Sequence, residues 1–340
     1  MQAKGKKRYI IGIIIVIICL IFCVEKLSHM EEHTSQKNDT QAEQTSQADK
    51  DSEAEQTSQA DKDSETEPSS QADKDSETEP SSQADKDSQA DIIDPAGNTL
   101  QTRIHTPAGF ARQEVAEESL EAFLRNYTMK ADGEKVLLYN GKEKGNQSAH
   151  ASVFTLPIEN ADLQQCADSV MRVYAEYYWS IGAYDKIKFH FTNGFLAEYE
   201  KWREGYRVVV DGNDVSWSKS ASYDDSYESF VKYLRVVFSY AGTLSMESEA
   251  TKISLEEAKA GDVFLQGGSP GHVVMIVDVC VNEEGKKAFL LAQGYMPAQE
   301  FHVLKNDLHE EDPWYYEEEI TYPLSTPEYT FQEGSLKTLY

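Results

Sequence analysis

Three residues that lie far apart in the sequence could together perform thiol chemistry. Cys166 lies in a segment with helical periodicity, His272 begins a strongly apolar segment, and Gln293 lies in the next apolar segment. A cysteine nucleophile needs a base that takes its proton, and the base needs a polar group that orients it. It also benefits from a donor to the oxyanion, and Gln164 and Gln165 directly precede Cys166. None of these residues is specific alone, but together they suggest a catalytic site.

The register of one hairpin decides whether His272 and Gln293 can meet. If the chain turns over residues 282–285, His272 lies opposite Tyr295, and Gln293 is one diagonal step away on the same face. Diagonal neighbours in a sheet are about 7–8 Å apart, which a glutamine and an imidazole can bridge. A two-residue turn at 284–285 would instead leave Gln293 four positions away, and another residue would have to orient the histidine.

The predicted folded region contains two cysteines, Cys166 and Cys280. Cys280 lies eight residues beyond His272 in the same predicted strand, which corresponds to about 26 Å. A disulfide between the two cysteines and a contact between Cys166 and His272 therefore exclude each other. The apolar sequence VVMIVDVCV around Cys280 is typical of an ordinary buried thiol.

Each candidate also has a purely structural explanation. Cys166 belongs to one apolar helical seam with Leu163, Val170, Val173 and Tyr177, and free cysteines are often buried in cores. With Asn160 or Asp162 as the expected N-cap, Cys166 lies beyond the first turn, where the helix dipole has little effect on a thiol. His272 alone fits a loop histidine that precedes a core strand.

The pattern of apolar residues predicts a mixed fold. Helical periodicity favours helices over residues 114–127, 161–179 and 226–242. Strand-like segments bounded by Asn, Gly or Pro occupy residues 135–142, 150–158, 187–194, 206–217, 271–281 and 286–296. Because helices and strands do not alternate regularly, the α+β class is expected.

The N-terminal part of the chain has the composition of an anchor and a tether. Residues 9–24 are uncharged and apolar and follow the basic residues 1–8, which predicts an uncleaved transmembrane anchor with its basic end in the cytoplasm. A cleaved signal peptide is the alternative. Residues 25–91 contain acidic 12-residue repeats, and between Glu31 and Asp91 there is no Leu, Ile, Val or aromatic residue, which predicts a disordered linker. The folded domain is therefore expected over 92–340, on the extracytoplasmic side of the cell membrane.

Charge and motifs exclude several classes of function. The formal net charge is -27, and 19 Asp or Glu against 5 Lys lie between Glu31 and Asp91. Such a chain is a poor partner for nucleic acid, which needs clustered Lys and Arg. The sequence contains no CxxC, HExxH or phosphate-binding loop, so neither a metal nor a cofactor is expected. Trp202 could stack on a sugar or pack in the core.

Several motifs resemble those of a known family. The segments LQQCADSVMRVYAEY, GDVFLQGGSPGHVVMIVD and FLLAQGYMPAQ look like the bacterial family called domain of unknown function 4846. The resemblance extends over nearly all of residues 95–340, and it supplies no established activity.

A more distant resemblance concerns the order of the motifs. A cysteine helix, then GDVF and GHVVMIVD, then a strand with a polar residue, is similar to NlpC-type and CHAP-type cell-wall peptidases and amidases. The resemblance implies a papain-like core, in which a cysteine helix packs against an antiparallel sheet. It implies Cys166 as nucleophile, His272 as base and Gln293 as the orienting residue. Gln165 or Gln164 would donate to the oxyanion.

These patterns predict a membrane-anchored extracytoplasmic cysteine hydrolase, a peptidase or amidase that acts by thiol acyl transfer. The accessible substrate would be the stem peptide of peptidoglycan. Gln164, Trp202, Tyr295 and Gly271 are the expected substrate-binding residues, and the lipid bilayer is the expected partner of residues 9–24. The alternative is a non-catalytic surface domain on the same fold that binds cell-wall glycan or protein.

Overall fold

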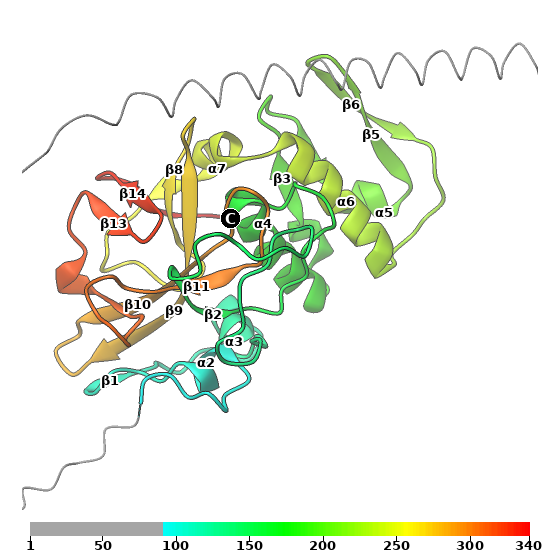
Figure 1. Cartoon of the computed structure of the whole chain (residues 1–340). Coiled ribbons are helices and arrows are strands. Elements are labelled where there is room, and N and C mark those ends of the chain that lie inside the picture. The colour runs from blue at the N-terminus through cyan, green and yellow to red at the C-terminus, as the bar shows by residue number, and fades with distance from the viewer. Residues whose placement is uncertain (1–90) are drawn as a thin grey trace, which may run out of the picture. The chain divides into compact units, whose positions relative to one another are not determined.

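A nine-stranded antiparallel sheet organises residues 91–340, the part of the chain that this computed structural model describes (Figure 1). Seven strands follow the order β2-β11-β10-β9-β8-β15-β7, while β1 pairs with β9 and β12 pairs with β10. The strands are β1 Phe110–Ala111, β2 His150–Val153, β7 Thr251–Lys252, β8 Val263–Gln266, β9 His272–Asn282, β10 Lys287–Gln293, β11 His302–Leu304, β12 Tyr315–Tyr316 and β15 Leu336–Thr338.

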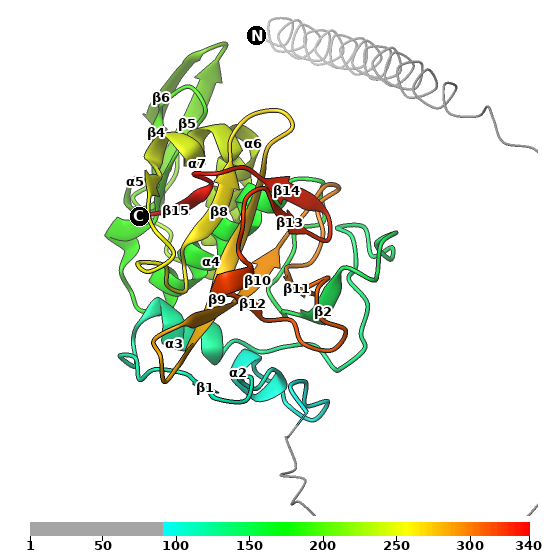
Figure 2. The ribbon, with the colours of Figure 1, turned by 90° about the vertical axis from the view of Figure 1, so that its left-hand side faces the viewer.

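Three two-stranded sheets lie outside the main sheet. They are formed by β3 (Lys188–His190) with β4 (Leu196–Glu198), β5 (Tyr206–Asp211) with β6 (Asp214–Lys219), and β13 (Leu324–Thr326) with β14 (Tyr329–Phe331). The β5–β6 hairpin projects beyond the body of the domain in two perpendicular views (Figures 1 and 2). The β13–β14 hairpin instead packs beside β8 and contributes to the site described below.

The two longest helices, α4 and α6, pack together on one side of the sheet (Figure 1). The helical segments are α2 Leu100–Arg103, α3 Leu120–Arg125, α4 Cys166–Ser180, α5 Tyr199–Arg203, α6 Tyr227–Tyr240, α7 Thr243–Glu249 and the 3-10 turns η1 Tyr184–Lys186 and η2 Glu317–Glu319. The predicted α+β class is confirmed by this mixture of helices and a mostly antiparallel sheet.

The start of α4 differs from the prediction. The helix begins at Cys166 with Gln165 as its N-cap, not at Asn160 or Asp162. The Asp168 carboxylate accepts a hydrogen bond from the Gln165 backbone N–H (3.1 Å), which satisfies an amide that precedes the first helical turn. Cys166 is therefore the first residue of the helix and not an interior residue.

Other predicted elements are also shorter or absent, as two examples show. The helix expected over 114–127 forms only over α3, where the Ser119 hydroxyl accepts from the Ala122 N–H and caps the start. The strand expected over 135–142 forms isolated bridges, because the chain turns at Gly141 with a positive φ of 77°. Short apolar runs next to turn residues do not distinguish a strand from a bridged loop.

The central strand β9 is buried on both faces, which explains its continuous apolar sequence. Val273, Met275 and Val277 face one core with α4 and α6, while Val274 and Ile276 face a second core with β13 and β14. Figure 2 shows this long strand running through the middle of the domain. Its first residue is thus held rigidly from both sides.

A β-bulge sets the register at the end of the β9–β10 hairpin. Lys287 pairs with Val281 near the turn, one position away from the predicted pairing of Val281 with Lys286. The register then shifts between Leu290 and Leu291, where β9 contains one extra residue. Beyond the bulge, the pairing follows the predicted register, which places Gln293 one diagonal step from the residue opposite His272.

The extra residue also turns Asp278 to the face of the sheet that carries α3. Asp278 is fully buried, and its two carboxylate oxygens accept from Arg125 Nε (2.8 Å) and Arg112 Nε (2.6 Å). Arg125 also donates to the Gln113 and Val279 carbonyls. This ion cluster joins the first part of the described chain to the central strand.

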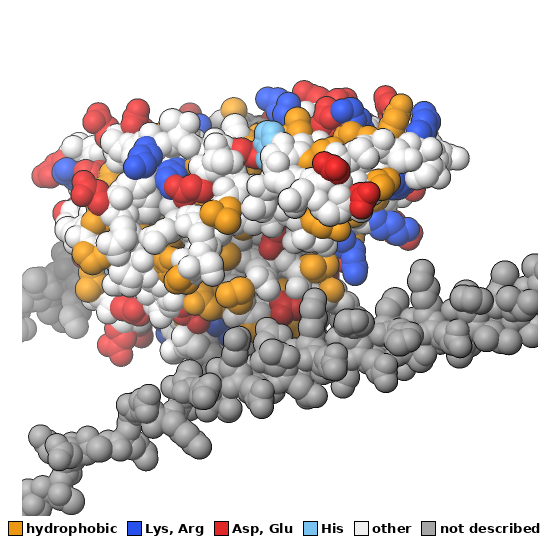
Figure 3. All heavy atoms as spheres, turned by 90° about the horizontal axis from the view of Figure 1, so that it is seen from above, with side chains coloured by type: hydrophobic (Ala, Val, Ile, Leu, Met, Phe, Trp, Pro, Cys, Tyr) orange, Lys and Arg blue, Asp and Glu red, His pale blue; other side chains and the backbone are white. Residues whose placement is uncertain are grey.

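Surface charges of both signs are intermixed. On the face seen in Figure 3, basic side chains occur in small groups beside acidic ones. Exposed pairs include Lys232 with Glu228 at 2.8 Å and Lys135 with Glu143 at 2.6 Å. Exposed pairs of this kind contribute about 0–1 kcal/mol, so the stability of the domain depends on its cores and buried polar clusters.

No helix within residues 91–340 is both long and apolar enough to cross a membrane. The predicted anchor at residues 9–24 and nearly all of the predicted linker at residues 25–91 lie outside the described residues.

We expect Asp278→Ala to lower the free energy of unfolding by about 3–5 kcal/mol, because it leaves two largely buried arginines without their carboxylate. Urea denaturation followed by tryptophan fluorescence measures this change. Glu228→Ala, which removes one partner of an exposed helical pair, is the matched control and should cost about 0.5 kcal/mol or less. Equal effects of the two variants would show that the Asp278 cluster does not stabilise the fold.

Candidate functional site

One pocket of about 550 Å³ brings together most of the predicted site residues. It lies where the start of α4, the α6–α7 junction, the β8–β9 loop, the end of β10 and the start of β14 meet. Its lining consists of Asp162, Leu163, Gln165, Cys166, Ala167, Asp168, Phe238, Ser239, Ala241, Gly242, Thr243, Gly268, Ser269, Pro270, Gly271, His272, Tyr295, Met296 and Tyr329. Cys166 and His272, 106 positions apart in the sequence, thus line one cavity.

The Cys166 thiol lies among backbone amides. The N–H groups of Cys166, Ala167 and Val273 act on the sulfur and favour its thiolate form. Burial nevertheless dominates and, with the nearby Asp168 carboxylate, raises the thiol pKa to about 11. Because Val273 directly follows His272, the contact places the thiol at the beginning of β9. The resting thiol is therefore protonated at neutral pH.

The orientation of the His272 ring is defined by a hydrogen-bond chain. His272 Nε2 lies 2.7 Å from Gln293 Oε1, and Gln293 Nε2 donates to Glu328 Oε2 at 2.7 Å. A carboxylate only accepts, so the glutamine must turn its NH₂ toward Glu328 and its oxygen toward the histidine. His272 then carries its proton on Nε2, which leaves Nδ1 free to accept another proton. Gln293 therefore reaches His272, as the register expected from the sequence allows.

Burial keeps the imidazole neutral. His272 is 2% exposed, and desolvation lowers its pKa to about 4 despite the opposing effects of Gln293 and Glu328. The ring lies 5.0 Å from the Tyr295 ring, 5.0 Å from the Tyr329 ring and 6.0 Å from the Phe331 ring, measured between centroids. These aromatic residues exclude water from the ring and hold it in place.

Glu328 and Lys144 extend the chain and were not predicted from the sequence. The Glu328 carboxylate forms an ion pair with Lys144 and accepts from Asn146 Nδ2 at 3.2 Å. Lys144 Nζ also lies 3.4 Å from His302 Nε2, and His302 donates from Nδ1 to the Glu300 carbonyl (2.8 Å). Glu328 lies in the turn between β13 and β14 and Lys144 in an irregular loop. No periodicity marks either position in the sequence.

Two glycines allow the backbone segments to approach the pocket closely. A Cβ on Gly294 would lie 2.2 Å from Ser169 Oγ on α4, so the end of β10 can meet this helix only without a side chain. A Cβ on Gly271 would lie 2.5 Å from the Gly268 carbonyl oxygen and 2.6 Å from Thr243 Oγ1. Both glycines are therefore required by packing next to the residues that line the pocket.

The other predicted site residues divide into two groups. Gln165, Gly271 and Tyr295 line the pocket. Gln164 does not, because it is fully buried and its side-chain amide donates to the Pro157 carbonyl (3.1 Å). Trp202 is also not in the lining, since it is packed in the core with its indole N–H on Ser229 Oγ (3.1 Å). The structure therefore does not bring Gln164 and Trp202 to this pocket.

Both cysteines of the described region are free thiols. Cys280 is fully buried, and burial raises its pKa strongly. It lies at the far end of β9 from His272, where it pairs with Ala288. The alternative of a disulfide between Cys166 and Cys280 is thus wrong.

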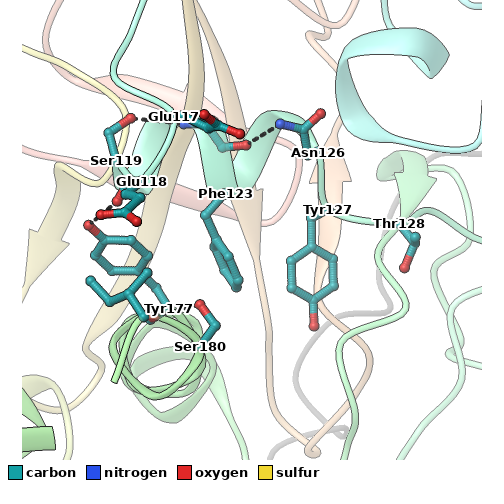
Figure 4. Close-up of a pocket in the computed structure, with 11 residues that line it drawn as sticks. Glu117, Glu118, Ser119, Phe123, Asn126, Tyr127, Thr128, Tyr177 and Ser180 are labelled. Carbon is teal, nitrogen blue, oxygen red and sulfur yellow. Dashed lines mark hydrogen bonds between the residues drawn. The ribbon is translucent and has the colours of Figure 1, made fainter. Parts of the chain in front are cut away.

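A second pocket of about 520 Å³ lies between α3 and α4 (Figure 4). In Figure 4 the rings of Phe123 and Tyr127 point into it beside Tyr177, whose hydroxyl donates to the Glu118 carbonyl at 2.9 Å. Its described lining contains no Cys, His, Lys or Arg. Within residues 91–340, no group of three or more His, Cys, Asp or Glu side chains could hold a metal ion. The Cys166 pocket is therefore the stronger candidate for chemistry.

Comparison with known proteins places the chain in a family without a described activity. A family model described as "Domain of unknown function (4846)" matches residues 100–338, which cover most of the described region. No curated protein matches the sequence, and no solved structure matches it. The resemblance noted in the sequence motifs is thereby confirmed, and the chain belongs to the family called domain of unknown function 4846.

Proposed function

We propose that the domain is a cysteine hydrolase, a peptidase or amidase that transfers an acyl group to the Cys166 thiol. The observation that carries this proposal is the arrangement of the pocket, which Cys166 at the start of α4 and His272 both line, with His272 hydrogen-bonded to Gln293. A nucleophile, a base and an orienting group are the three parts that acyl transfer to a thiol requires.

The protonation states favour general-base catalysis over a preformed ion pair. With the Cys166 pKa at about 11 and the His272 pKa at about 4, both groups are neutral near pH 7. The thiol transfers its proton to His272 Nδ1 as Sγ attacks the substrate carbonyl carbon. The carbonyl π electrons move to the oxygen, which becomes an oxyanion. Gln293 stabilises the resulting imidazolium through its hydrogen bond to Nε2.

The tetrahedral intermediate then collapses to a thioester. The C–N bond breaks, and the leaving amine takes the proton from His272 Nδ1. In the second half-reaction a water molecule attacks the thioester and gives a proton to Nδ1. The C–S bond breaks, the carboxylic acid leaves, and the sulfur regains its proton from the histidine.

The start of α4 is suited to stabilise the oxyanion. The first N–H groups of a helix have no intrahelical partner and lie at the positive end of its dipole. Cys166 contributes one of these groups, and the Gln165 side chain, bonded to Asp162 Oδ1 at 3.1 Å, lines the same pocket. Donors already in place cost no reorganisation during the reaction.

A papain-like core and a cell-wall substrate are part of the same proposal. The order of a cysteine helix followed by a histidine strand and a polar residue on the next strand supports the papain-like assignment. The apolar residues 9–24 and the acidic repeats that follow support a membrane anchor and a tether. An extracytoplasmic domain held in this way would reach the stem peptides of peptidoglycan.

We expect Cys166→Ala to abolish acylation of the full-length protein by a peptidyl electrophile, and His272→Ala to slow it about 10²–10⁴-fold. Peptide mass spectrometry after labelling measures the rate and identifies the modified residue among the four cysteines of the chain. Cys280→Ala is the matched control and should leave the rate unchanged. Labelling that is independent of His272 would favour a pocket that binds peptides without cleaving them.

The acylation rate should decrease below pH 5, with a midpoint at about 4. Protonated His272 cannot accept the thiol proton, and its pKa is about 4 in this pocket. The rate should then stay level to at least pH 8, because both groups remain neutral. A midpoint close to 6.5, the value of a solvated histidine, would contradict a buried base. In His272→Ala this acidic limb should disappear.

Glu328→Gln should lower kcat up to about 100-fold while KM changes little, because a misplaced base affects the transition state more than binding. We treat Glu328 as a positioning residue, since it acts on His272 through Gln293. The variant also leaves Lys144 without its ion-pair partner. The double variant Lys144→Met, Glu328→Gln should therefore restore stability but not kcat. Recovery of kcat together with stability would indicate a purely structural role.

A further inference from the structure

We propose that the Cys166 pocket takes a substrate with a protonated amine next to the acyl group that it presents to the thiol. This inference rests on the proposed acyl transfer and names the class of its substrate. The amine is the free α-amine or the side-chain amine of a peptide residue at the cleavage site.

The lining of the pocket contains acidic and neutral groups only. Asp162 and Asp168 belong to it, whereas none of its described residues is Lys or Arg. The buried cation nearest to His272 along the hydrogen-bond chain is Lys144, which lies behind Gln293 and is neutralised by Glu328. A substrate carboxylate would therefore meet two carboxyl groups and no compensating cation in this pocket.

Asp168 has an oxygen that lacks a partner. The residue is 6% exposed, and its Oδ2 accepts from the Gln165 N–H, while its Oδ1 has no hydrogen bond. Buried polar atoms normally have a partner, so this oxygen is a candidate to accept from a ligand N–H. Burial raises the Asp168 pKa to about 8. An ammonium group nearby would favour the ionised carboxylate and gain a charge-assisted hydrogen bond.

The C-terminal end of α6 also lines the pocket. This helix has 14 residues, and its last turn contributes Phe238 and Ser239 to the lining. The carbonyl groups at a helix C-terminus carry partial negative charge and favour cations. The Tyr240 carbonyl is occupied by the Thr192 N–H (2.9 Å), but in residues 91–340 no backbone N–H from outside α6 bonds to the Phe238 or Ser239 carbonyl.

The two helix ends favour charges of opposite sign in the pocket. The N-terminus of α4 next to Cys166 favours the negative oxygen of the substrate carbonyl, and the C-terminus of α6 favours a positive group. The rings of Tyr295 and Tyr329 also line the pocket, and aromatic faces attract cations. A carbonyl with an adjacent ammonium group matches this distribution of charge.

The test compares three peptidyl acyloxymethyl ketones that differ only at the residue next to the reactive carbon, which is lysyl, norleucyl or glutamyl. We measure the second-order rate constant for alkylation of Cys166 in the full-length protein. The lysyl reagent should react about tenfold faster than the norleucyl reagent, and the glutamyl reagent should be slowest. High salt should reduce these differences.

Asp168→Asn and Asp162→Asn should each reduce the ratio of the lysyl to the norleucyl rate constant severalfold, whatever their effect on the two rates separately. Asp162 is exposed, so its variant keeps the test valid even if Asp168→Asn does not fold. Asp211→Asn removes the same charge from the distant β5–β6 hairpin and should have no effect.

The outcomes separate this inference from the proposed function. If norleucyl or glutamyl reagents react as fast as the lysyl reagent, and all three depend on His272, the amine preference is wrong and the acyl transfer function stands. If no reagent labels Cys166 in a manner that depends on His272, both are wrong.

Discussion

The hydrogen bond between His272 and Gln293 is the constraint on which the candidate site depends. It forms only if β9 and β10 pair in one particular register at the open end of their hairpin, about ten residues from the turn. The bulge between Leu290 and Leu291 supplies that register. The same bulge turns Asp278 toward its two arginines. One extra residue in the strand thus fixes both the imidazole and the ion cluster that ties the preceding segments to the sheet.

The polar groups behind the imidazole form a chain that is almost free of solvent. From His272 through Gln293 and Glu328 to Lys144, each side chain has a partner, and all are buried except Glu328, whose side chain is 10% exposed. Such a network is costly when it is incomplete and rigid when it is complete. The charges at its far end cancel, so the imidazole is held by geometry and not by a strong local field. This agrees with an imidazole whose pKa burial lowers to about 4, so that it is neutral at pH 7.

Sequence patterns predicted those parts of the domain that follow from periodicity. The hairpin of β9 and β10 and the helix α6 follow from apolar repeats bounded by turn residues. The predicted start of α4 was wrong. The N-cap is Gln165, whose backbone N–H donates to the Asp168 carboxylate, whereas the more usual cap residues Asn160 and Asp162 lie before the helix. Glu328 could not be predicted, since its role depends on how the β13–β14 turn packs against a distant strand. Gln164 and Trp202 were predicted to bind substrate, but both side chains are buried in the core and do not reach the pocket.

The position of β13 and β14 near the end of the chain has a consequence for when the site can exist. Glu328 and Tyr329 come from this hairpin, and β15, which follows it, is inserted between β8 and β7 in the main sheet. Cys166 and His272 emerge from the ribosome well before these residues. The histidine therefore lacks its support until the β13–β14 hairpin has been synthesised, and a chain that stops short of β13 leaves the sheet with a missing strand. The geometry of the candidate site is therefore completed only after its cysteine and histidine have been made.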